Sequence, residues 1–474
     1  MSGRYESLLA RRRRHARRRR NLRIATVLAA GFAIGIVAVR GIEPPATALS
    51  LDAFLPDVSA AGVSITARAE PVTPPPAPVP SVPPALLATL PPTVRAPVRA
   101  AALDAPGRLV ERVEIDPSSS VPGPLEIEYT LDTALTRRVA QILEPVELAH
   151  VVVLDPTDGR VLTYASTAPG EFPATRPYPT ASLMKVVTAA AVLEHAPEAA
   201  ERPCRFVGSP YYLAQNLLDP PTRGREVTFV QALGMSNNQC FARLAVHELG
   251  SLTVVDAMQR LGLLEPPGPG HLPGEVDPVH DRLELGKLGS GLAGSRISPL
   301  AAARLAAVLV NGQVIAPRWI ERVRDANGND LRMPDPVAPR PAFAPALTSM
   351  LRSMMIETTE RGTARRAFHA RDGSLLLDPI PVAGKTGSLN GQNPDGHYEW
   401  FIGLAPADAP RVAIATLVVN RGKWRRTASQ VAADVLRAVF CDAGACRVDA
   451  AQPASGRDDP ARARRSAARE QDRG

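Results

Sequence analysis

Lysine is scarce in this chain, which has four lysines and 51 arginines. Two of the four, Lys185 and Lys385, lie in short motifs that also contain serine. Arginine stays protonated in proteins and cannot serve as a base, whereas a lysine with a lowered pKa can. We therefore expect that lysine is kept where a removable proton matters.

Aromatic residues are also few, at 4% of the chain, so we expect a core built mostly of Ala, Leu and Val. The cysteines and histidines show no zinc-like spacing, and we expect neither a metal nor a cofactor. No internal repeat is visible, which argues against a repeat architecture.

The four cysteines fall in two places. Cys204 and Cys240 flank the segment Ser236-Asn237-Asn238, while Cys441 and Cys446 bracket a short polar loop. Two disulfides would fit an exported protein. Four cysteines allow three pairings, the sequence does not choose among them, and four unpaired thiols remain the alternative.

Positive charge is concentrated at one end. The formal charge is +8, yet residues 1–23 hold ten arginines and one glutamate, so the remaining chain is near −1. Because one basic arm supplies the whole imbalance, we expect no nucleic-acid partner. The arm precedes an apolar run at residues 24–40, an order typical of the positive-inside rule.

This apolar run predicts a single membrane anchor. Its uncharged part, residues 24–39, would measure about 24 Å as a helix, and flanking apolar residues extend it toward the ~30 Å hydrocarbon core. We expect the arm in the cytoplasm and the folded domain outside it. A cleaved signal peptide is the alternative, with a small-x-small site at residues 46–48.

The rest of the chain divides by composition. Fifteen prolines lie between Pro71 and Pro124, so we expect residues 41–125 to be a linker, able to span on the order of 150 Å as polyproline helix. Residues 126–447 form the expected domain. Residues 448–474, rich in Arg, Asp, Ala and Gly, are expected to be disordered.

Hydrophobic patterns predict the elements of this domain. A hairpin is expected where two β-branched runs flank Asp158-Gly159, and a buried helix where Ser182 begins a run that is apolar all round. The other expected elements are a helix at 134–143, strands at 382–388, 400–404 and 412–419, and a helix at 427–440. This order indicates an α+β fold with an antiparallel sheet, helices packed against it and an inserted helical lobe.

Three short motifs follow one another along the domain: S-x-x-K at residues 182–185, S-x-N at 236–238 and K-T-G at 385–387. Helix geometry places Ser182 and Lys185 on one face, so the amine can approach the hydroxyl. A serine hydroxyl is a poor nucleophile without an adjacent base. Lys185 is that base only if burial and the like charge of Lys385 lower its pKa.

The ordered triplet resembles the penicillin-binding protein and serine β-lactamase superfamily. The resemblance extends over residues 126–446 and includes the hairpin, the Ser298-Pro299 helix start, the 362–364 segment and the 400–403 segment. It implies a five-stranded antiparallel sheet flanked by helices, with the site between the sheet and the inserted helical lobe.

The resemblance also implies roles for the motif residues. Ser182 would be the nucleophile, Lys185 its base, and Ser236 a proton relay to the leaving amine. Asn238 would hold a substrate backbone amide. The carboxylate that ends a D-Ala-D-Ala stem peptide would be bound by Lys385, Thr386, Gly387 and Ser388. The backbone N–H groups of Ser182 and Ser388 would form the oxyanion hole. Apart from the resemblance, His397 and Glu399 lie near K-T-G in the sequence; we expect them in a surface loop, with a place in the lining of the cleft as the alternative.

The function expected from this resemblance is a peptidoglycan D,D-transpeptidase that works through a serine acyl-enzyme and is acylated by penicillin. Its partners would be peptidoglycan stem peptides, β-lactams, the bacterial inner membrane through one helix, and a separate glycosyltransferase, because no glycosyltransferase domain precedes the linker. D,D-carboxypeptidase activity, with water as acceptor, is the first alternative.

Two further alternatives are weaker. A class A β-lactamase needs an E-x-x-L-N loop, and none occurs between Asn238 and Lys385; the S-x-V form of the second motif is also absent. A non-catalytic penicillin or muropeptide sensor needs an output module, and a 23-residue arm leaves little room for one.

Overall fold

The computed structural model describes residues 79–103, 107–115, 121, 123–422, 426–442 and 445–447. The expected arm (1–23), anchor (24–40) and tail (448–474) lie outside these residues. Within the described ranges, no helix combines the length and the apolar character needed to cross a bilayer.

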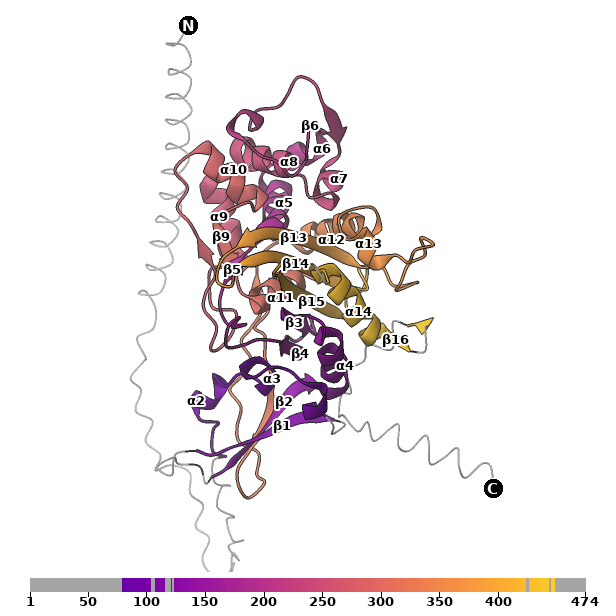
Figure 1. The fold of residues 1–474 in the computed structure, drawn as a ribbon. Helices are drawn as coiled ribbons and strands as arrows, with labels where there is room; N and C mark the ends of the chain where they lie inside the picture. The colour runs from indigo at the N-terminus through magenta and orange to yellow at the C-terminus, as the bar shows by residue number, and fades with distance from the viewer. Residues whose placement is uncertain are drawn as a thin grey trace, which may run out of the picture. The chain divides into compact units, whose positions relative to one another are not determined.

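A five-stranded antiparallel sheet forms the centre of the fold, with the strand order β13-β14-β15-β3-β4 (Figure 1). The strands are β3 (Leu148–Leu154), β4 (Val161–Ser166), β13 (Ala383–Gly391), β14 (Gly396–Ala405) and β15 (Val412–Asn420). The predicted α+β fold with this sheet is confirmed. The Asp158-Gly159 turn joins β3 to β4 as expected, and Gly159 has a φ of +76°, which favours glycine.

Both faces of the sheet are buried. Along β3, Val152 faces one apolar core while Val151 and Val153 face the other, as the period of a strand requires. The helices that cover the two faces are α11 (Pro299–Val308) on the first and α4 (Thr133–Leu143) with α14 (Ala428–Phe440) on the second. The predicted helices at 134–143 and 427–440 match α4 and α14 within one residue.

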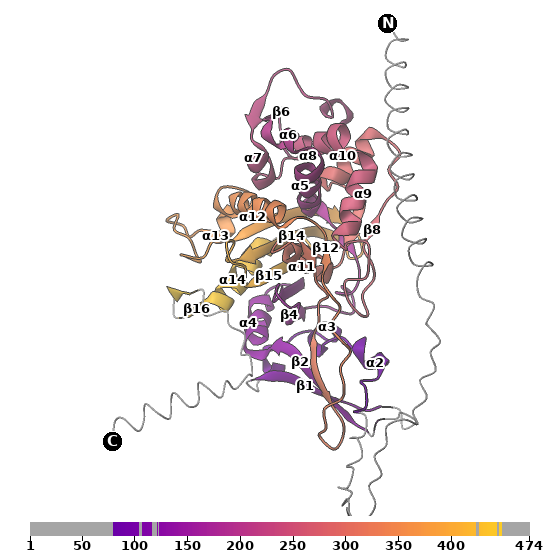
Figure 2. The ribbon, with the colours of Figure 1, turned by 180° about the vertical axis from the view of Figure 1, so that it is seen from behind.

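The helical lobe lies at the β13 end of the sheet in both views (Figures 1 and 2). It contains α5 (Met184–His195), α6 (Pro197–Glu201), α7 (Phe229–Gly234), α8 (Asn238–Arg243), the π-helical turn η4 (Leu244–Leu249), α9 (Gly250–Arg260), α10 (Arg282–Ser290), the short η3 (Gln215–Leu217) and the hairpin β6 (Cys204–Phe206) with β7 (Arg225–Val227). A disulfide joins Cys204 to Cys240 within this lobe.

The expected linker does not extend to residue 125. Its described part forms α2 (Pro84–Leu87), α3 (Pro92–Arg95), η1 (Ala100–Leu103) and β1 (Arg108–Val113). β1 pairs with β2 (Leu125–Asp132), which pairs with β11 (Ile320–Arg324). Val82, Leu86 and Val94 are buried against the main core. The predicted boundary at residue 126 is therefore wrong, because apolar side chains between the prolines pack on the domain.

The remaining elements complete the edges of the domain. They are η2 (Ala181–Leu183), α12 (Pro345–Glu360), α13 (Arg365–Phe368), the strands β5 (Tyr178–Pro179), β8 (Glu275–Val276) and β9 (Ser295–Ile297), and the pairs β10 (Gln313–Val314) with β12 (Arg340–Pro341) and β16 (Cys441–Asp442) with β17 (Ala445–Cys446). A second disulfide joins Cys441 to Cys446.

Candidate active site

Ser182 lies in the tight turn η2, directly before helix α5. Ala181 has a φ of +50°, a conformation that non-glycine residues adopt rarely. Gly291, directly after α10, packs closely against this turn: a Cβ on Gly291 would lie 1.9 Å from the carbonyl oxygen of Ala181. Glycine at 291 therefore allows α10 to reach the serine turn, which brings the carbonyl of Ser290 into the site.

Lys185 is fully buried beneath Ser182. Its Nζ lies 2.9 Å from Ser182 Oγ, 2.6 Å from Asn238 Oδ1 and 2.5 Å from the carbonyl oxygen of Ser290. The Asn238 amide is oriented by its other end, since Nδ2 donates to the carbonyl of Tyr211 at 2.6 Å. The oxygen of that amide therefore faces the lysine.

A neutral amine can make all three contacts. Asn238 Oδ1 and the Ser290 carbonyl only accept hydrogen bonds, so they take two N–H bonds of Lys185. A neutral amine has two N–H bonds and one lone pair, which leaves the lone pair for the hydroxyl proton of Ser182. The geometry therefore suits a base that removes this proton.

Burial lowers the pKa of Lys185 well below its usual range, and the positive charge of Lys385 lowers it further. Burial also lowers the pKa of Lys385, to about 7. Within the described part of the chain, neither lysine has a carboxylate partner among the ion pairs. Burial and the like charge of Lys385, the two effects expected from the sequence, therefore both lower the pKa of Lys185.

The second motif contacts both lysines. Lys385 Nζ donates to Ser236 Oγ at 2.9 Å and to the carbonyl of Thr386 at 2.8 Å. Ser236 is buried and has a φ of +60°, so its backbone turns sharply where α7 ends. Because Asn238 contacts Lys185 and Ser236 contacts Lys385, the motif bridges the two amines.

Strand β13 forms the other side of the cleft. The hydroxyl oxygen of Thr386 lies 2.5 Å from that of Thr363, in the loop before α13. Gly387 lies against the serine turn, since a Cβ there would be 3.2 Å from the Ala181 Cβ. Ser388 follows with an exposed side chain. The strand therefore presents its residues beside Ser182.

A cavity of about 620 Å³ lies between these elements. All eight residues predicted from the motifs meet here, six in the lining and the two lysines through their hydrogen bonds: Ser182, Lys185, Ser236, Asn238, Lys385, Thr386, Gly387 and Ser388. Sequence reasoning gave no role to Ser290, Gly291, Tyr211 and Thr363, although the glycine-rich stretch at 286–294 was a signal for close packing.

Glu399 also lines the cavity, and the prediction of a surface loop is wrong for it. The residue lies within β14 opposite Ser388 and is 9% exposed. Asn420 Nδ2 donates to Glu399 Oε2 at 3.2 Å. Burial raises the pKa of Glu399 to about 7, although the backbone N–H of Ala428 opposes this shift. His397 also lies in β14 rather than in a loop.

Among the described residues, no group of three or more His, Cys, Asp or Glu side chains lies close enough to hold a metal ion.

Comparison with known proteins agrees with this geometry. The family model of the penicillin binding protein transpeptidase domain matches residues 149–440, which is more than half of the chain. The chain belongs to this family. The match contains every motif residue and ends at the last residue of α14.

Two mycobacterial proteins are similar to this chain in sequence. The peptidoglycan D,D-transpeptidase PbpA of Mycobacterium tuberculosis is 26% identical over 280 residues, and that of Mycolicibacterium smegmatis is 27% identical over 285 residues. Each alignment covers 56% of this chain. The chain spans about half the length of these curated relatives, 54% and 55%.

Solved structures share the fold. The crystal structure of PBPA from Mycobacterium tuberculosis superposes with a TM-score of 0.57 at 21% identity, covering 68% of this chain and 84% of that chain. The D,D-transpeptidase domain of a peptidoglycan glycosyltransferase from Eggerthella lenta superposes with a TM-score of 0.54 at 22% identity, covering 66% and 82%.

Proposed function

We propose that this chain is a peptidoglycan D,D-transpeptidase that cross-links stem peptides through an acyl-enzyme on Ser182. The observation that carries the proposal is the contact set of Lys185, whose two carbonyl acceptors leave its lone pair for the Ser182 hydroxyl. The motif triplet and the names of the mycobacterial relatives support the same reaction.

In the first half of the reaction, Lys185 takes the proton of Ser182 as Oγ attacks the carbonyl carbon between the two D-alanines of the donor peptide. The backbone N–H groups of Ser182 and Ser388 stabilise the oxyanion that forms. Lys385, Thr386 and Ser388 bind the terminal carboxylate.

Collapse of this intermediate breaks the C–N bond and releases D-alanine. Ser236, which accepts a hydrogen bond from Lys385, passes the proton to the leaving amine. In the second half, the amine of an acceptor stem peptide attacks the ester carbonyl, gives up a proton by the reverse route and regenerates Ser182. A β-lactam follows only the first half, because its amide opens but stays attached.

The N-terminal segments complete the proposal. A basic arm at residues 1–23 and an apolar segment at 24–40 support a single-pass anchor in the cytoplasmic membrane of a bacterium, with the catalytic domain outside the cytoplasm. A separate glycosyltransferase would then supply the glycan strands whose stem peptides this domain joins.

Labelling with a fluorescent penicillin tests the proposal. The full chain is purified in detergent, incubated with the label and separated on a denaturing gel. We expect one stable adduct that is lost in Ser182→Ala. Labelling of Ser182→Ala at the wild-type level would remove Ser182 as the nucleophile.

A thioester analogue of the D-Ala-D-Ala donor separates the related activities. With a D-amino acid as acceptor, transfer to the amine identifies a transpeptidase, whereas hydrolysis alone identifies a D,D-carboxypeptidase. Rapid turnover of penicillin without any reaction of the thioester would identify a β-lactamase. We expect transfer, together with a penicilloyl adduct that persists for many minutes.

A further inference from the structure

The helix that carries the second motif is covalently tied to one wall of the cleft. α8 begins at Asn238, and Cys240 in the same helix forms a disulfide with Cys204 in β6. β6 leads into the loop at 207–212, in which Tyr211 lines the active-site cavity. The disulfide therefore joins the helix of Asn238 to the segment that presents Tyr211.

Hydrogen bonds from α8 hold the same loop. Gln239 is fully buried, and its Nε2 donates to the carbonyls of Val207 and Ser209 at 2.7 and 3.0 Å. Asn238 Nδ2 donates to the carbonyl of Tyr211 at 2.6 Å. Each such bond contributes only about 1 kcal/mol net. The covalent link acts together with these bonds to fix the loop on the helix.

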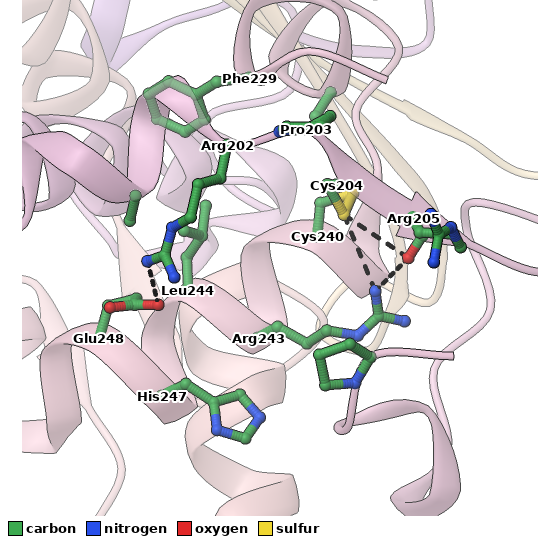
Figure 3. Close-up of a pocket in the computed structure, with 13 residues that line it drawn as sticks. Arg202, Pro203, Cys204, Arg205, Phe229, Cys240, Arg243, Leu244, His247 and Glu248 are labelled. Atoms are coloured by element: carbon green, nitrogen blue, oxygen red, sulfur yellow. Dashed lines mark hydrogen bonds and ion pairs between the residues drawn. A yellow bond between two sulfur atoms is a disulfide. The ribbon is translucent and has the colours of Figure 1, made fainter. Parts of the chain in front are cut away.

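The disulfide borders an open cavity. This cavity of about 230 Å³ has a mostly apolar lining that includes Phe229 and Leu244, with Cys204 and Cys240 on its wall (Figure 3). Cys204 is partly exposed, whereas Cys240 is 2% exposed. A small thiol can thus reach the Cys204 sulfur.

A buried cation lies beside the sulfur. Arg243 donates to the carbonyl of Arg205, and its Nη1 is 3.8 Å from Cys204 Sγ (Figure 3). Attack of a dithiol on the Cys204 sulfur releases the Cys240 thiolate and leaves a mixed disulfide on Cys204. In the second step the dithiol closes on itself and releases the Cys204 thiolate, which the positive charge of Arg243 favours. The surroundings of the Cys204–Cys240 pair therefore favour its opening.

We infer that the Cys204–Cys240 disulfide is a clamp that positions the Tyr211 wall of the cleft, and that its opening by a dithiol weakens binding of donor peptide and β-lactam. In this step the S–S bond breaks and the dithiol passes two electrons and two protons to the cysteines, becoming a cyclic disulfide itself. The inference rests on the function proposed above.

The clamp acts on binding more than on chemistry. Ser182 and Lys185 lie on η2 and α5, outside the two segments that the disulfide joins, and Lys185 has hydrogen bonds to Ser182 and to the Ser290 carbonyl besides the one to Asn238 of α8. Opening the clamp should therefore raise the penicillin concentration that gives half the limiting acylation rate, while the limiting rate changes little.

The experiment measures acylation of the full chain over a range of fluorescent penicillin concentrations. It compares the oxidised protein, the protein reduced with dithiothreitol, and the reduced protein after re-oxidation. We expect reduction to raise the half-saturating concentration about tenfold, with the labelled amplitude unchanged and full recovery on re-oxidation. A change in amplitude alone would indicate a merely structural disulfide and overturn the clamp.

Two double variants assign the effect. Cys204→Ala/Cys240→Ala should reproduce the reduced state and no longer respond to dithiothreitol. Cys441→Ala/Cys446→Ala removes the other disulfide and should respond like wild type. An unchanged half-saturating penicillin concentration in the first variant overturns the clamp. If that variant does not fold, the half-saturating concentration of the reduced wild type is the deciding measurement. Absence of acylation in the oxidised wild type contradicts the proposed function instead.

Discussion

Lys185 and Lys385 lie in the same cleft, are both fully buried and lack a described carboxylate partner, yet their contacts differ. Lys185 meets two oxygens that only accept and one hydroxyl, whereas Lys385 meets Ser236 Oγ and the carbonyl of Thr386. Equal burial therefore does not imply equal chemistry. Lys185 lies against the hydroxyl of Ser182, whereas Lys385 lies against that of Ser236.

The charge of one lysine acts on the other. The pKa of Lys385 falls to about 7, so it carries a positive charge in part of the neutral range. That charge adds to burial in lowering the pKa of Lys185. The pair thus supports a division of labour, with Lys185 as the neutral base and Lys385 as the cation that binds a carboxylate.

Removing the base should have the largest effect. Lys185→Arg keeps the charge but cannot accept the proton, so we expect the limiting rate of acylation by penicillin to fall by roughly 10²-fold or more. Stopped-flow or gel measurements of labelling against time give this rate. Acylation of the variant within a few-fold of wild type would make Lys185 a structural residue.

Two further variants control for the fold. Lys185→Met has no charge to bury and should lose acylation equally, while its thermal unfolding stays cooperative. Lys287→Arg makes the same exchange in α10, at a lysine outside the cavity lining, and should acylate like wild type.

The Ser182–Lys185 pair could be predicted because helix spacing alone brings residues i and i+3 together. The other contacts of Lys185 come from Asn238 and Ser290, 53 and 105 residues away, so only the folded chain brings them near. A pattern reports local geometry and apolar faces. It does not predict which distant carbonyl oxygen will lie next to the Lys185 amine in the folded chain.

The two incorrect predictions, a linker that extends to residue 125 and a surface loop at Glu399, have a similar cause. Proline-rich composition predicted a linker up to residue 125, but no proline lies within residues 107–116, and β1 forms there by pairing with β2. Glu399 was expected in a surface loop near the K-T-G motif. β14 includes it because β13 and β15 pair with the strand on both sides.

Glu399 extends the comparison to a buried group of opposite charge. Its pKa rises from 4.5 to about 7 in the folded protein, so the folded chain keeps this proton where the unfolded chain has lost it. The contribution of Glu399 to stability should therefore decrease as pH rises from about 5 to about 7, by on the order of 2 kcal/mol, and level off above that range.

Glu399→Gln should remove this decrease, because the amide cannot ionise but still accepts a bond from Asn420. Urea unfolding of both proteins at about pH 5 and about pH 8 provides the measurement. Equal pH dependence in the two proteins would assign the decrease to other groups.

Lys385→Met tests the coupling between the lysines. Without the neighbouring positive charge the pKa of Lys185 should rise, although burial still holds it below the usual range. Because neutral Lys185 is the active form, the limiting acylation rate should reach its plateau at a higher pH than in wild type. An unchanged pH profile, with only the half-saturating penicillin concentration raised, would show that Lys385 binds without tuning the base.

The smallest effect is expected at the contact of Thr386 with Thr363, whose hydroxyl oxygens lie 2.5 Å apart. Thr363→Val keeps the shape and removes one partner, while Thr363→Ser keeps the hydroxyl and serves as the matched control. A neutral hydrogen bond of this kind contributes about 1 kcal/mol, so Thr363→Val should raise the half-saturating penicillin concentration a few-fold and leave the limiting rate unchanged. If the limiting rate falls instead, while Thr363→Ser behaves like wild type, the hydroxyl pair positions β13 for the oxyanion hole rather than for the carboxylate. The division between the two lysines would then include a contribution of β13 to the chemical step itself.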